Sequence, residues 1–238
     1  MALGYTQNEL GGLQTLVVPG APGGLVVAVL HGYGADAHDL LPLCREIDAP
    51  AGTTWLVPHA PQEVEIGPHV MGRAWFPIDL MALQLAMLAG RAPDMSRASP
   101  PQLATSRAMV AAMLHAAGAA LDNTVLMGFS QGAMVATSLA LESAVAPAGL
   151  AILSGTLLDE PHWRTLAPRH RGLRFVQSHG RDDPLLSHAA AQRLNHLLGD
   201  AGWLGQFVSF GGGHEIPGEV IFKCGQLLRE VAPAVPPR

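Results

Sequence analysis

The sequence predicts an α/β fold in which helices cover both faces of a mostly parallel, twisted sheet. Short apolar runs alternate with helical windows along the chain, and this alternation is typical of βαβ units. Most of the apolar runs are continuous rather than interrupted by polar residues, as expected for strands buried on both faces. A length of 238 residues fits one large α/β domain, so we expect a single domain over residues 1–238.

The strands are expected at the apolar runs. Residues 13–18 are expected to form an edge strand, and the β-branched run at residues 25–30 (LVVAVL) is expected to form a strand inside the sheet. Further strands are expected at residues 54–57, 124–127, 149–153, 173–177 and 206–210.

The helices are expected between these runs. They cover residues 102–117, 131–142, 187–198 and 217–231. Apolar residues recur at helical spacing in the first and third of these windows. Ser187 stands where an N-cap is expected. Residues 90–101 are rich in proline and serine and are expected to form a loop.

The composition excludes several classes of protein. Charged residues make up 14% of the chain and hydrophobic residues 49%, the reverse of a disordered protein. The 14 basic residues are spread thinly, so no nucleic-acid partner is expected. Residues 1–10 lack the basic and apolar regions of a signal peptide, and the apolar stretch at residues 80–89 is too short to span a bilayer. We therefore expect a cytoplasmic protein without stable membrane insertion.

Residues 128–132 (GFSQG) form a Gly-x-Ser-x-Gly pattern between an expected strand and an expected helix. A nucleophile elbow requires this setting, because the glycines allow a tight turn and the helix N-terminus directs unpaired N–H groups at the reacting centre. Ser130 is therefore the candidate nucleophile. The alternative is an ordinary strand-to-helix turn in which the serine caps the helix.

A serine nucleophile needs a base and an orienting acid, which in α/β-hydrolases follow it in the order acid, then histidine. The sixth expected strand leads into Asp182 and Asp183, and the seventh leads into three glycines and His214. Alternatively, the aspartates form a turn and His214 lies in a surface loop. His179, in the same segment as the aspartates, is expected to be a structural loop residue.

Residues 30–34 (LHGYG) directly follow the second expected strand, from where α/β-hydrolases supply an oxyanion-hole donor. One backbone N–H is expected from Gln131, next to the nucleophile, and the other from Tyr33 or a close neighbour. The alternative is a plain glycine-rich turn. A phosphate-binding loop is disfavoured, because the segment matches neither Gly-x-Gly-x-x-Gly nor a P-loop with its lysine.

Several short motifs follow one another in a fixed order. They are residues 30–34 (LHGYG), 58–61 (PHAP), 73–76 (RAWF), 128–132 (GFSQG), 153–155 (LSG), 179–184 (HGRDDP) and 213–214 (GH). Together they resemble the phospholipase/carboxylesterase family, which includes acyl-protein thioesterases and bacterial carboxylesterases. The resemblance implies an α/β-hydrolase fold, with Ser130 as nucleophile, Asp183 as acid and His214 as base. It also implies an oxyanion hole from the backbone N–H groups of Tyr33 and Gln131.

The resemblance places the Trp-Phe pair of the family at Trp75 and Phe76, near the acyl pocket, so both are expected to bind substrate. Two positions depart from the family pattern. Tyr33 stands where members often carry leucine, and Pro77 stands where they often carry aspartate. Both lie near the expected pocket, so they bear on the substrate and leave the chemistry intact.

Residues 77–100 are expected to form a lid or a wall of the pocket. The segment 79–90 (DLMALQLAMLAG) is apolar and rich in methionine, a side chain suited to adaptable apolar surfaces. The candidate lining residues are Leu80, Met81, Leu85, Met87 and Leu88. Of these, we expect Leu80 and Met87 to contact substrate. The alternative is an ordinary amphipathic helix packed on the core or on a partner subunit.

These inferences predict a serine hydrolase that cleaves carboxylic esters of short to medium acyl chains through a Ser-His-Asp triad and an acyl-enzyme. No metal or organic cofactor is expected, the substrate is a small ester or thioester, and the chain is a monomer or a homodimer. Acyl-protein thioesterase, lysophospholipase and a non-catalytic ligand-binding homologue are the alternatives. A metal site is disfavoured, because the chain has neither His-Glu-x-x-His nor a paired cysteine motif. The histidines considered for it are His31, His38, His59 and His69.

Overall fold

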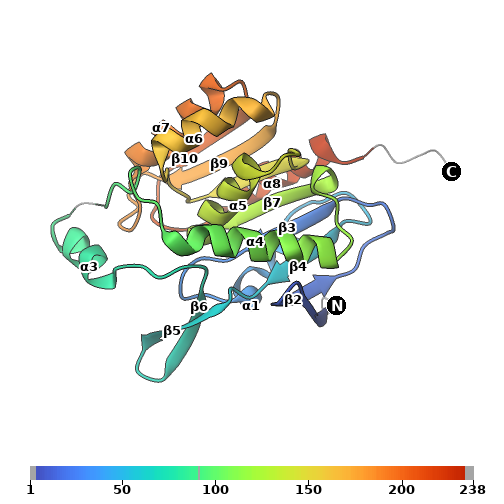
Figure 1. The fold of residues 1–238 in the computed structure, drawn as a ribbon, viewed down its shortest axis with the longest axis horizontal. Coiled ribbons are helices and arrows are strands. Elements are labelled where there is room, and N and C mark those ends of the chain that lie inside the picture. The colour runs from blue at the N-terminus through green and yellow to red at the C-terminus, as the bar shows by residue number, and fades with distance from the viewer. Residues whose placement is uncertain (1–3, 91, 234–238) are drawn as a thin grey trace.

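The computed structural model describes residues 4–90 and 92–233 and is built on an eight-stranded sheet (Figure 1). The strand order is β1-β2-β4-β3-β7-β8-β9-β10. At one edge, β1 (Thr6–Leu10) and β2 (Leu13–Val18) run antiparallel to their neighbours. The other strands run parallel to one another: β4 (Thr54–Pro58), β3 (Val26–Leu30), β7 (Thr124–Phe129), β8 (Gly149–Leu153), β9 (Arg174–Gly180) and β10 (Leu204–Phe210).

Helices cover both faces of this sheet, which confirms the predicted fold class (Figure 1). One face carries α4 (Pro101–Ala116), α5 (Gln131–Glu142), α6 (Glu160–Leu166) and α7 (His188–Asp200). The other face carries α1 (Ala37–Leu40), α2 (Leu43–Glu46) and α8 (Gly218–Val231). Two short 3₁₀ helices, Leu121–Asn123 and Ala167–His170, lie between these elements.

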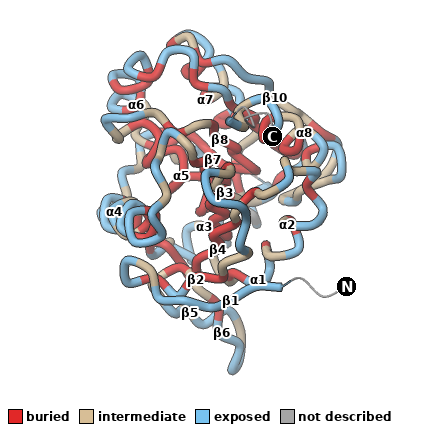
Figure 2. Tube along the Cα trace, turned by 90° about the vertical axis from the view of Figure 1, so that its right-hand side faces the viewer, coloured by how far each residue is buried: buried red, intermediate tan, exposed pale blue. Residues whose placement is uncertain are grey.

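The strands are apolar throughout because successive side chains enter different cores. Along β3, Ala28 and Leu30 pack under α4 and α5, whereas Val27 and Val29 pack on the side of α1 and α8. All four side chains are fully buried. Figure 2 shows the same arrangement, with buried strands between the two helical layers. Since burying a valine or leucine side chain contributes about 1.5–3 kcal/mol, both faces stabilise the sheet.

All the strands predicted from apolar runs are present, and the four predicted helices are α4, α5, α7 and α8. The predicted cap is also confirmed, because the Ser187 side chain accepts a hydrogen bond from the Ala190 N–H at 3.3 Å. Exposed elements were missed. The edge strand β1 is polar and mostly exposed, and the hairpin of β5 (Gln62–Gly67) and β6 (Val70–Ala74) lies outside the main sheet.

Loops that follow parallel strands meet at the carboxyl edge of the sheet. Ser130 follows β7, Asp183 follows β9, and His214 follows β10. The turn of residues 31–34 follows β3, which is hydrogen-bonded to β7. The fold therefore brings the candidate catalytic residues to one edge from distant parts of the sequence.

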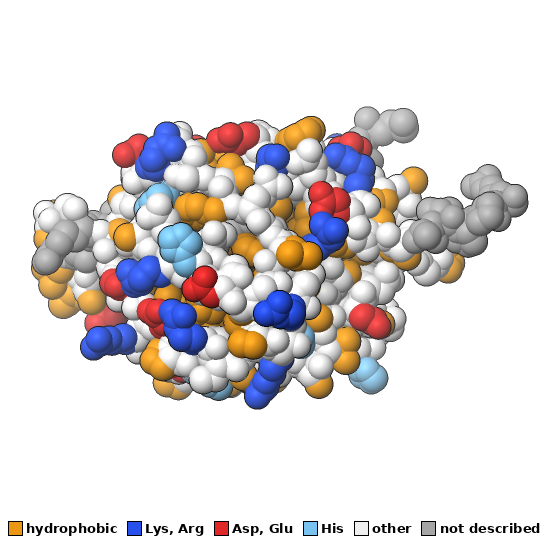
Figure 3. Space-filling view, turned by 90° about the horizontal axis from the view of Figure 1, so that it is seen from above, with side chains coloured by type: hydrophobic (Ala, Val, Ile, Leu, Met, Phe, Trp, Pro, Cys, Tyr) orange, Lys and Arg blue, Asp and Glu red, His pale blue; other side chains and the backbone are white. Residues whose placement is uncertain are grey.

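Residues 77–90 and 92–100 leave the main body beside this edge and carry α3 (Leu80–Leu88), which projects from the sheet layers (Figure 1). Asp79 begins α3, since its side chain accepts a hydrogen bond from the Ala82 N–H at 2.9 Å. The returning loop is anchored on α6 and α7. There the Glu160 N–H donates to the Ser96 carbonyl at 2.7 Å, and Arg193 pairs with Asp94. Hydrophobic side chains gather at this end of the molecule (Figure 3).

We predict that Gly132→Ala destabilises the protein by at least about 2 kcal/mol, because a Cβ at Gly132 would overlap the carbonyl oxygen of Leu30, a main-chain atom that cannot move freely. Urea unfolding measures the change. Gly199→Ala is the matched control, since Gly199 lies in α7 with no atom near its would-be Cβ, and alanine favours the helix by up to about 1 kcal/mol. Equal stability of the Gly132 variant and the wild type would contradict the close packing.

Candidate active site

Ser130 occupies a strained turn between β7 and α5. Its backbone has φ 55° and ψ −117°, a region that costs a non-glycine residue about 1–3 kcal/mol. The Ser130 N–H donates to the Leu153 carbonyl at 2.8 Å, which ties the turn to β8. The Ser130 side chain makes no capping hydrogen bond to α5, so the alternative of a helix-capping serine is wrong. Ser130 instead lines a cavity.

The structure distinguishes Asp183 from its neighbour Asp182. Asp182 is exposed, whereas Asp183 is buried and its Oδ2 accepts a hydrogen bond from His214 Nδ1 at 2.7 Å. Its other oxygen, Oδ1, accepts from the N–H groups of Leu185 at 2.8 Å and Leu186 at 3.0 Å. Burial by itself would raise the pKa of Asp183, but these hydrogen bonds and the imidazole hold it below its usual value. The carboxylate is therefore ionised and fixed in orientation.

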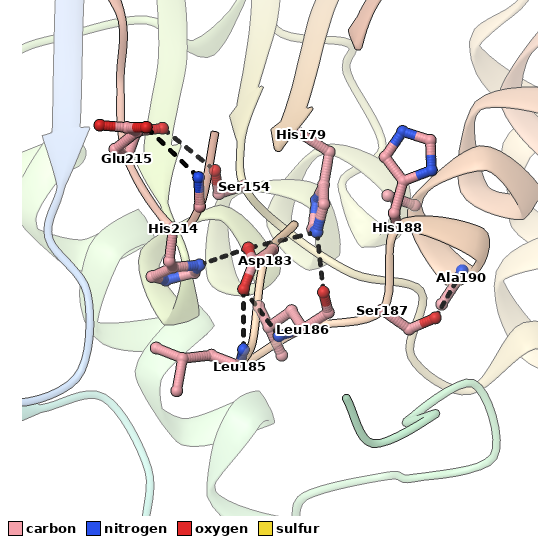
Figure 4. A network of polar contacts seen from close by, with 12 residues as sticks. Ser154, His179, Asp183, Leu185, Leu186, Ser187, His188, Ala190, His214 and Glu215 are labelled. Carbon is pink, nitrogen blue, oxygen red and sulfur yellow. Dashed lines mark hydrogen bonds and ion pairs between the residues drawn. The ribbon is translucent and has the colours of Figure 1, made fainter. Parts of the chain in front are cut away.

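His214 points toward Asp183 (Figure 4), and its ring also contacts the aromatic ring of Phe129. The His214 and Phe129 ring centroids are 4.8 Å apart. The loop that carries His214 is held by a hydrogen bond from the Ser154 hydroxyl to the Glu215 carbonyl at 3.3 Å. The imidazole therefore does not lie in a free surface loop.

Ser130 and His214 line the same cavity, so the structure brings the three candidate catalytic residues together. Within the described part of the chain, Ser130 Oγ and His214 Nε2 form no hydrogen bond with each other. Contacts of this kind are often long before substrate binds. Because His214 Nδ1 is occupied by Asp183, Nε2 is the nitrogen left to act as a base.

The candidate oxyanion donors Tyr33 and Gln131 also line this cavity. The turn that carries Tyr33 is held by His31, whose Nδ1–H donates to the Gly32 carbonyl at 2.7 Å and whose Nε2 accepts from the Ala60 N–H at 2.9 Å. The N–H of Gln131 belongs to the first turn of α5, where backbone donors have no partner within the helix. The two candidate backbone donors thus lie beside the cavity after the neighbouring strands β3 and β7.

Sequence reasoning missed the side chain of Gln131. Its Oε1 accepts from the Trp75 N–H at 2.8 Å, and its Nε2 donates to the Phe76 carbonyl at 2.7 Å. It thereby fastens the strand end at residues 74–76 to the first turn of α5. The only signal in the sequence was a glutamine next to the candidate nucleophile. A glutamine by itself does not identify the groups with which its side chain forms hydrogen bonds.

The cavity has a volume of about 590 Å³, within the range of small-molecule sites. Phe76 and Leu80 lie in its wall, as expected. Trp75 does not. Its ring is buried behind the turn of residues 31–34, where Nε1 donates to the His31 carbonyl at 2.9 Å, so this part of the pocket prediction is corrected. The remaining apolar wall comes mainly from Ile78, Leu83, Met95, Pro100, Met134 and Leu185.

The outer side of α3 does not line the cavity. Met81, Leu85 and Leu88 are 73%, 62% and 86% exposed, because α3 turns only one side toward the cavity. These three side chains were expected in the wall, so that expectation is corrected. The side chain of Met87, the other candidate in α3, lies outside what the structure describes.

Comparison with known proteins identifies the family. The family model described as Phospholipase/Carboxylesterase matches residues 14–231. The chain belongs to the phospholipase/carboxylesterase family. This is a family of carboxylic ester hydrolases, and the resemblance noted in the sequence is therefore confirmed. No curated protein matches the chain.

Solved structures of similar proteins show the same α/β-hydrolase fold. Esterase PE8 is 26% identical, with 92% of this chain and 99% of that chain covered, and a TM-score of 0.75. A carboxylesterase from Mesorhizobium loti is 21% identical, with 94% and 98% covered and a TM-score of 0.68. Acyl-protein thioesterase 2 from Zea mays is 23% identical, with 91% and 98% covered and a TM-score of 0.70.

Two further features of this phospholipase/carboxylesterase family member concern metal binding and membrane-spanning helices. Within residues 4–90 and 92–233, no three His, Cys, Asp or Glu side chains are grouped so that they could hold a metal ion. His59 Nδ1 instead accepts a hydrogen bond from the Ala37 N–H, and its ring packs against that of His38. In the same described ranges, no helix has the length and apolarity needed to cross a bilayer.

We predict that His31 makes stability depend on pH. Burial lowers the pKa of His31 to about 4, partly opposed by its hydrogen bond to Gly32. The unfolded chain therefore binds the extra proton below about pH 6.5, and stability is lost as the pH falls from there toward 4. Between pH 7 and pH 5 this one residue contributes a loss of about 2 kcal/mol.

Urea unfolding of His31→Gln at both pH values checks this, and we expect the pH-dependent loss to shrink by about that amount. His196→Gln is the matched control, because His196 is exposed, and it should keep the pH dependence of the wild type. An unchanged loss in His31→Gln would contradict the neutral state of His31.

Proposed function

We propose that this protein is a serine carboxylesterase that cleaves esters of short to medium carboxylic acids through an acyl-enzyme on Ser130. The observation that carries the proposal is the 2.7 Å hydrogen bond between Asp183 and His214, at a cavity that also exposes Ser130. A serine hydroxyl becomes a nucleophile when a neighbouring base takes its proton, and an oriented, uncapped serine beside a histidine held by a carboxylate meets that need.

The proposed reaction has two steps. His214 Nε2 takes the proton from Ser130 Oγ as Oγ attacks the ester carbonyl, and Asp183 stabilises the imidazolium that forms. The N–H groups of Tyr33 and Gln131 bind the developing oxyanion. His214 then donates the proton to the alcohol oxygen, the C–O bond breaks, and the acyl group stays on Ser130. Water, activated by His214, releases the acid and restores the hydroxyl.

The wall of the cavity favours neutral, apolar esters. Among the described residues that line it, none is lysine or arginine, and Asp79 is the only acid. A phosphate-bearing lysophospholipid is better recognised by cationic side chains, which form strong charge-assisted hydrogen bonds with phosphate. The apolar wall from Phe76, Ile78 and Leu83 instead suits an acyl chain. These features support a small carboxylic ester over a lysophospholipid.

We predict that Ser130→Ala lowers kcat for an aryl acetate by at least about 10³-fold, because the three triad residues act as a unit. Intact-mass analysis should show one fluorophosphonate adduct on the wild type and none on this variant. Ser99→Ala is the matched control, because Ser99 lines the same cavity, and it should still be labelled. Near-normal turnover of Ser130→Ala would overturn the proposed function.

We also predict that Leu83→Trp shifts the substrate preference toward shorter acyl chains, because the larger ring fills cavity space next to Phe76 and Ile78. Relative to the acetate ester, kcat/KM for octanoate should fall about tenfold or more. Leu88→Ala removes a side chain of the same helix that is 86% exposed and should leave the chain-length profile unchanged. Identical profiles for Leu83→Trp and the wild type would mean that this wall does not bind the acyl chain.

A further inference from the structure

A second histidine reaches the Asp183 carboxylate from the side opposite His214 (Figure 4). His179 lies in β9 and is fully buried. Its Nε2 is 3.3 Å from Asp183 Oδ2 and 3.0 Å from the carbonyl oxygen of Leu186. Oδ2 is the same oxygen that receives the hydrogen bond from His214.

The surroundings fix the proton on the His179 ring. Both neighbours of Nε2 are oxygen acceptors, so Nε2 carries the hydrogen, which it donates to the Leu186 carbonyl beside the contact with Asp183 Oδ2. Nδ1 is buried and has no hydrogen-bond partner among the described residues. Burial also lowers the pKa of His179, which keeps the ring neutral. A leucine would fill this space without an unpaired nitrogen, so what the imidazole adds is the donor directed at Asp183 and Leu186.

We propose that His179 is a positioning residue that clamps the Asp183 carboxylate and withdraws part of the charge on Oδ2 from His214. The inference rests on the proposed function and names a further residue for the same reaction. The ring hydrogen-bonds the Leu186 carbonyl and holds its Nε2 3.3 Å from Asp183 Oδ2, so it closes the turn in which Oδ1 already accepts two backbone N–H groups. With part of the charge on Oδ2 drawn toward His179, Asp183 holds a protonated His214 less tightly.

The groups that face His179 come from three elements. Asp183 lies in the loop after β9, and His214 in the loop after β10. His188 of α7 packs edge-on at a ring-centroid distance of 5.9 Å. His188 forms a hydrogen bond with the Ser209 hydroxyl at 2.8 Å. Burial and the charge of Arg181 lower the pKa of His188. His179 contacts Asp183 Oδ2 and His188 does not. Variants of the two histidines can therefore separate their effects.

The test compares His179→Leu, which removes the donor, with His179→Gln, whose amide N–H can reach the position of Nε2. In His179→Leu we expect kcat for an aryl ester to fall about tenfold with KM within about twofold of the wild type, because only the reacting geometry is disturbed. The acidic limb of the kcat/KM profile should move up by about 0.5 pH unit, since an un-neutralised Asp183 stabilises protonated His214. His179→Gln should restore both values toward the wild type.

His188→Leu is the matched control, because His188 does not contact Asp183, and its acidic limb should coincide with that of the wild type. The inference is overturned if folded His179→Leu keeps the wild-type limb, or if the leucine and glutamine variants shift it equally. Thermal unfolding establishes which variants are folded.

A measurement on the wild type keeps the inference testable if a variant does not fold. ¹⁵N-histidine NMR should show His179 as a neutral ring protonated on Nε2 from pH 5 to pH 8, and an Nδ1-protonated or charged ring at pH 7 would overturn the clamp. Failure of the proposed function has a different signature, namely a wild type that turns over no ester or an Asp183→Asn variant as active as the wild type. An active wild type that depends on Asp183, with no effect of His179→Leu, would refute the inference alone.

Discussion

The active-site edge depends on the close main-chain contact between the end of β3 and the first turn of α5. Gly132 packs on the Leu30 carbonyl, and Gly32 packs against the Ser130 side chain, at positions where an added Cβ would crowd its neighbours. This contact sets the distance between the turn that carries Tyr33 and the turn that carries Ser130. The candidate nucleophile and the candidate oxyanion donors are therefore placed by the backbone of two adjacent strands, and long side chains are not needed to position them.

The strain at Ser130 is sustained by the surrounding sheet. A strained φ costs about 1–3 kcal/mol, while β3, β7 and β8 are buried on both faces and supply many apolar side chains worth about 1.5–3 kcal/mol each. The Leu153 carbonyl and the Gln131 side chain fix the turn from two directions. Preorganisation at the nucleophile is thus a consequence of a rigid core rather than of local interactions alone.

The sequence was sufficient to predict which residues meet, because each candidate follows a parallel strand and such strands end at one edge. Ser130 and His214 needed only the strand assignments and the chain order, whereas the choice of Asp183 over Asp182 came from the family resemblance. Contacts across the fold could not be predicted this way. The Gln131 side chain and the ring of His179 meet their partners only through tertiary packing. Trp75 was placed in the pocket from the family resemblance, although its ring lies behind the turn of residues 31–34.

The acid and the histidines buried at this edge differ in charge, and that difference determines where the charge of the site lies. Burial lowers the pKa of His31 and of His179, and in each ring the hydrogen bond to a backbone carbonyl opposes this effect only in part. Asp183 keeps its charge because several N–H donors converge on it. The carboxylate is then the charged member of this buried network, and the imidazole with one face on the cavity is His214. In the proposed reaction, a proton taken from Ser130 is therefore stabilised on His214, since that ring combines access to the cavity with direct contact to the negative charge.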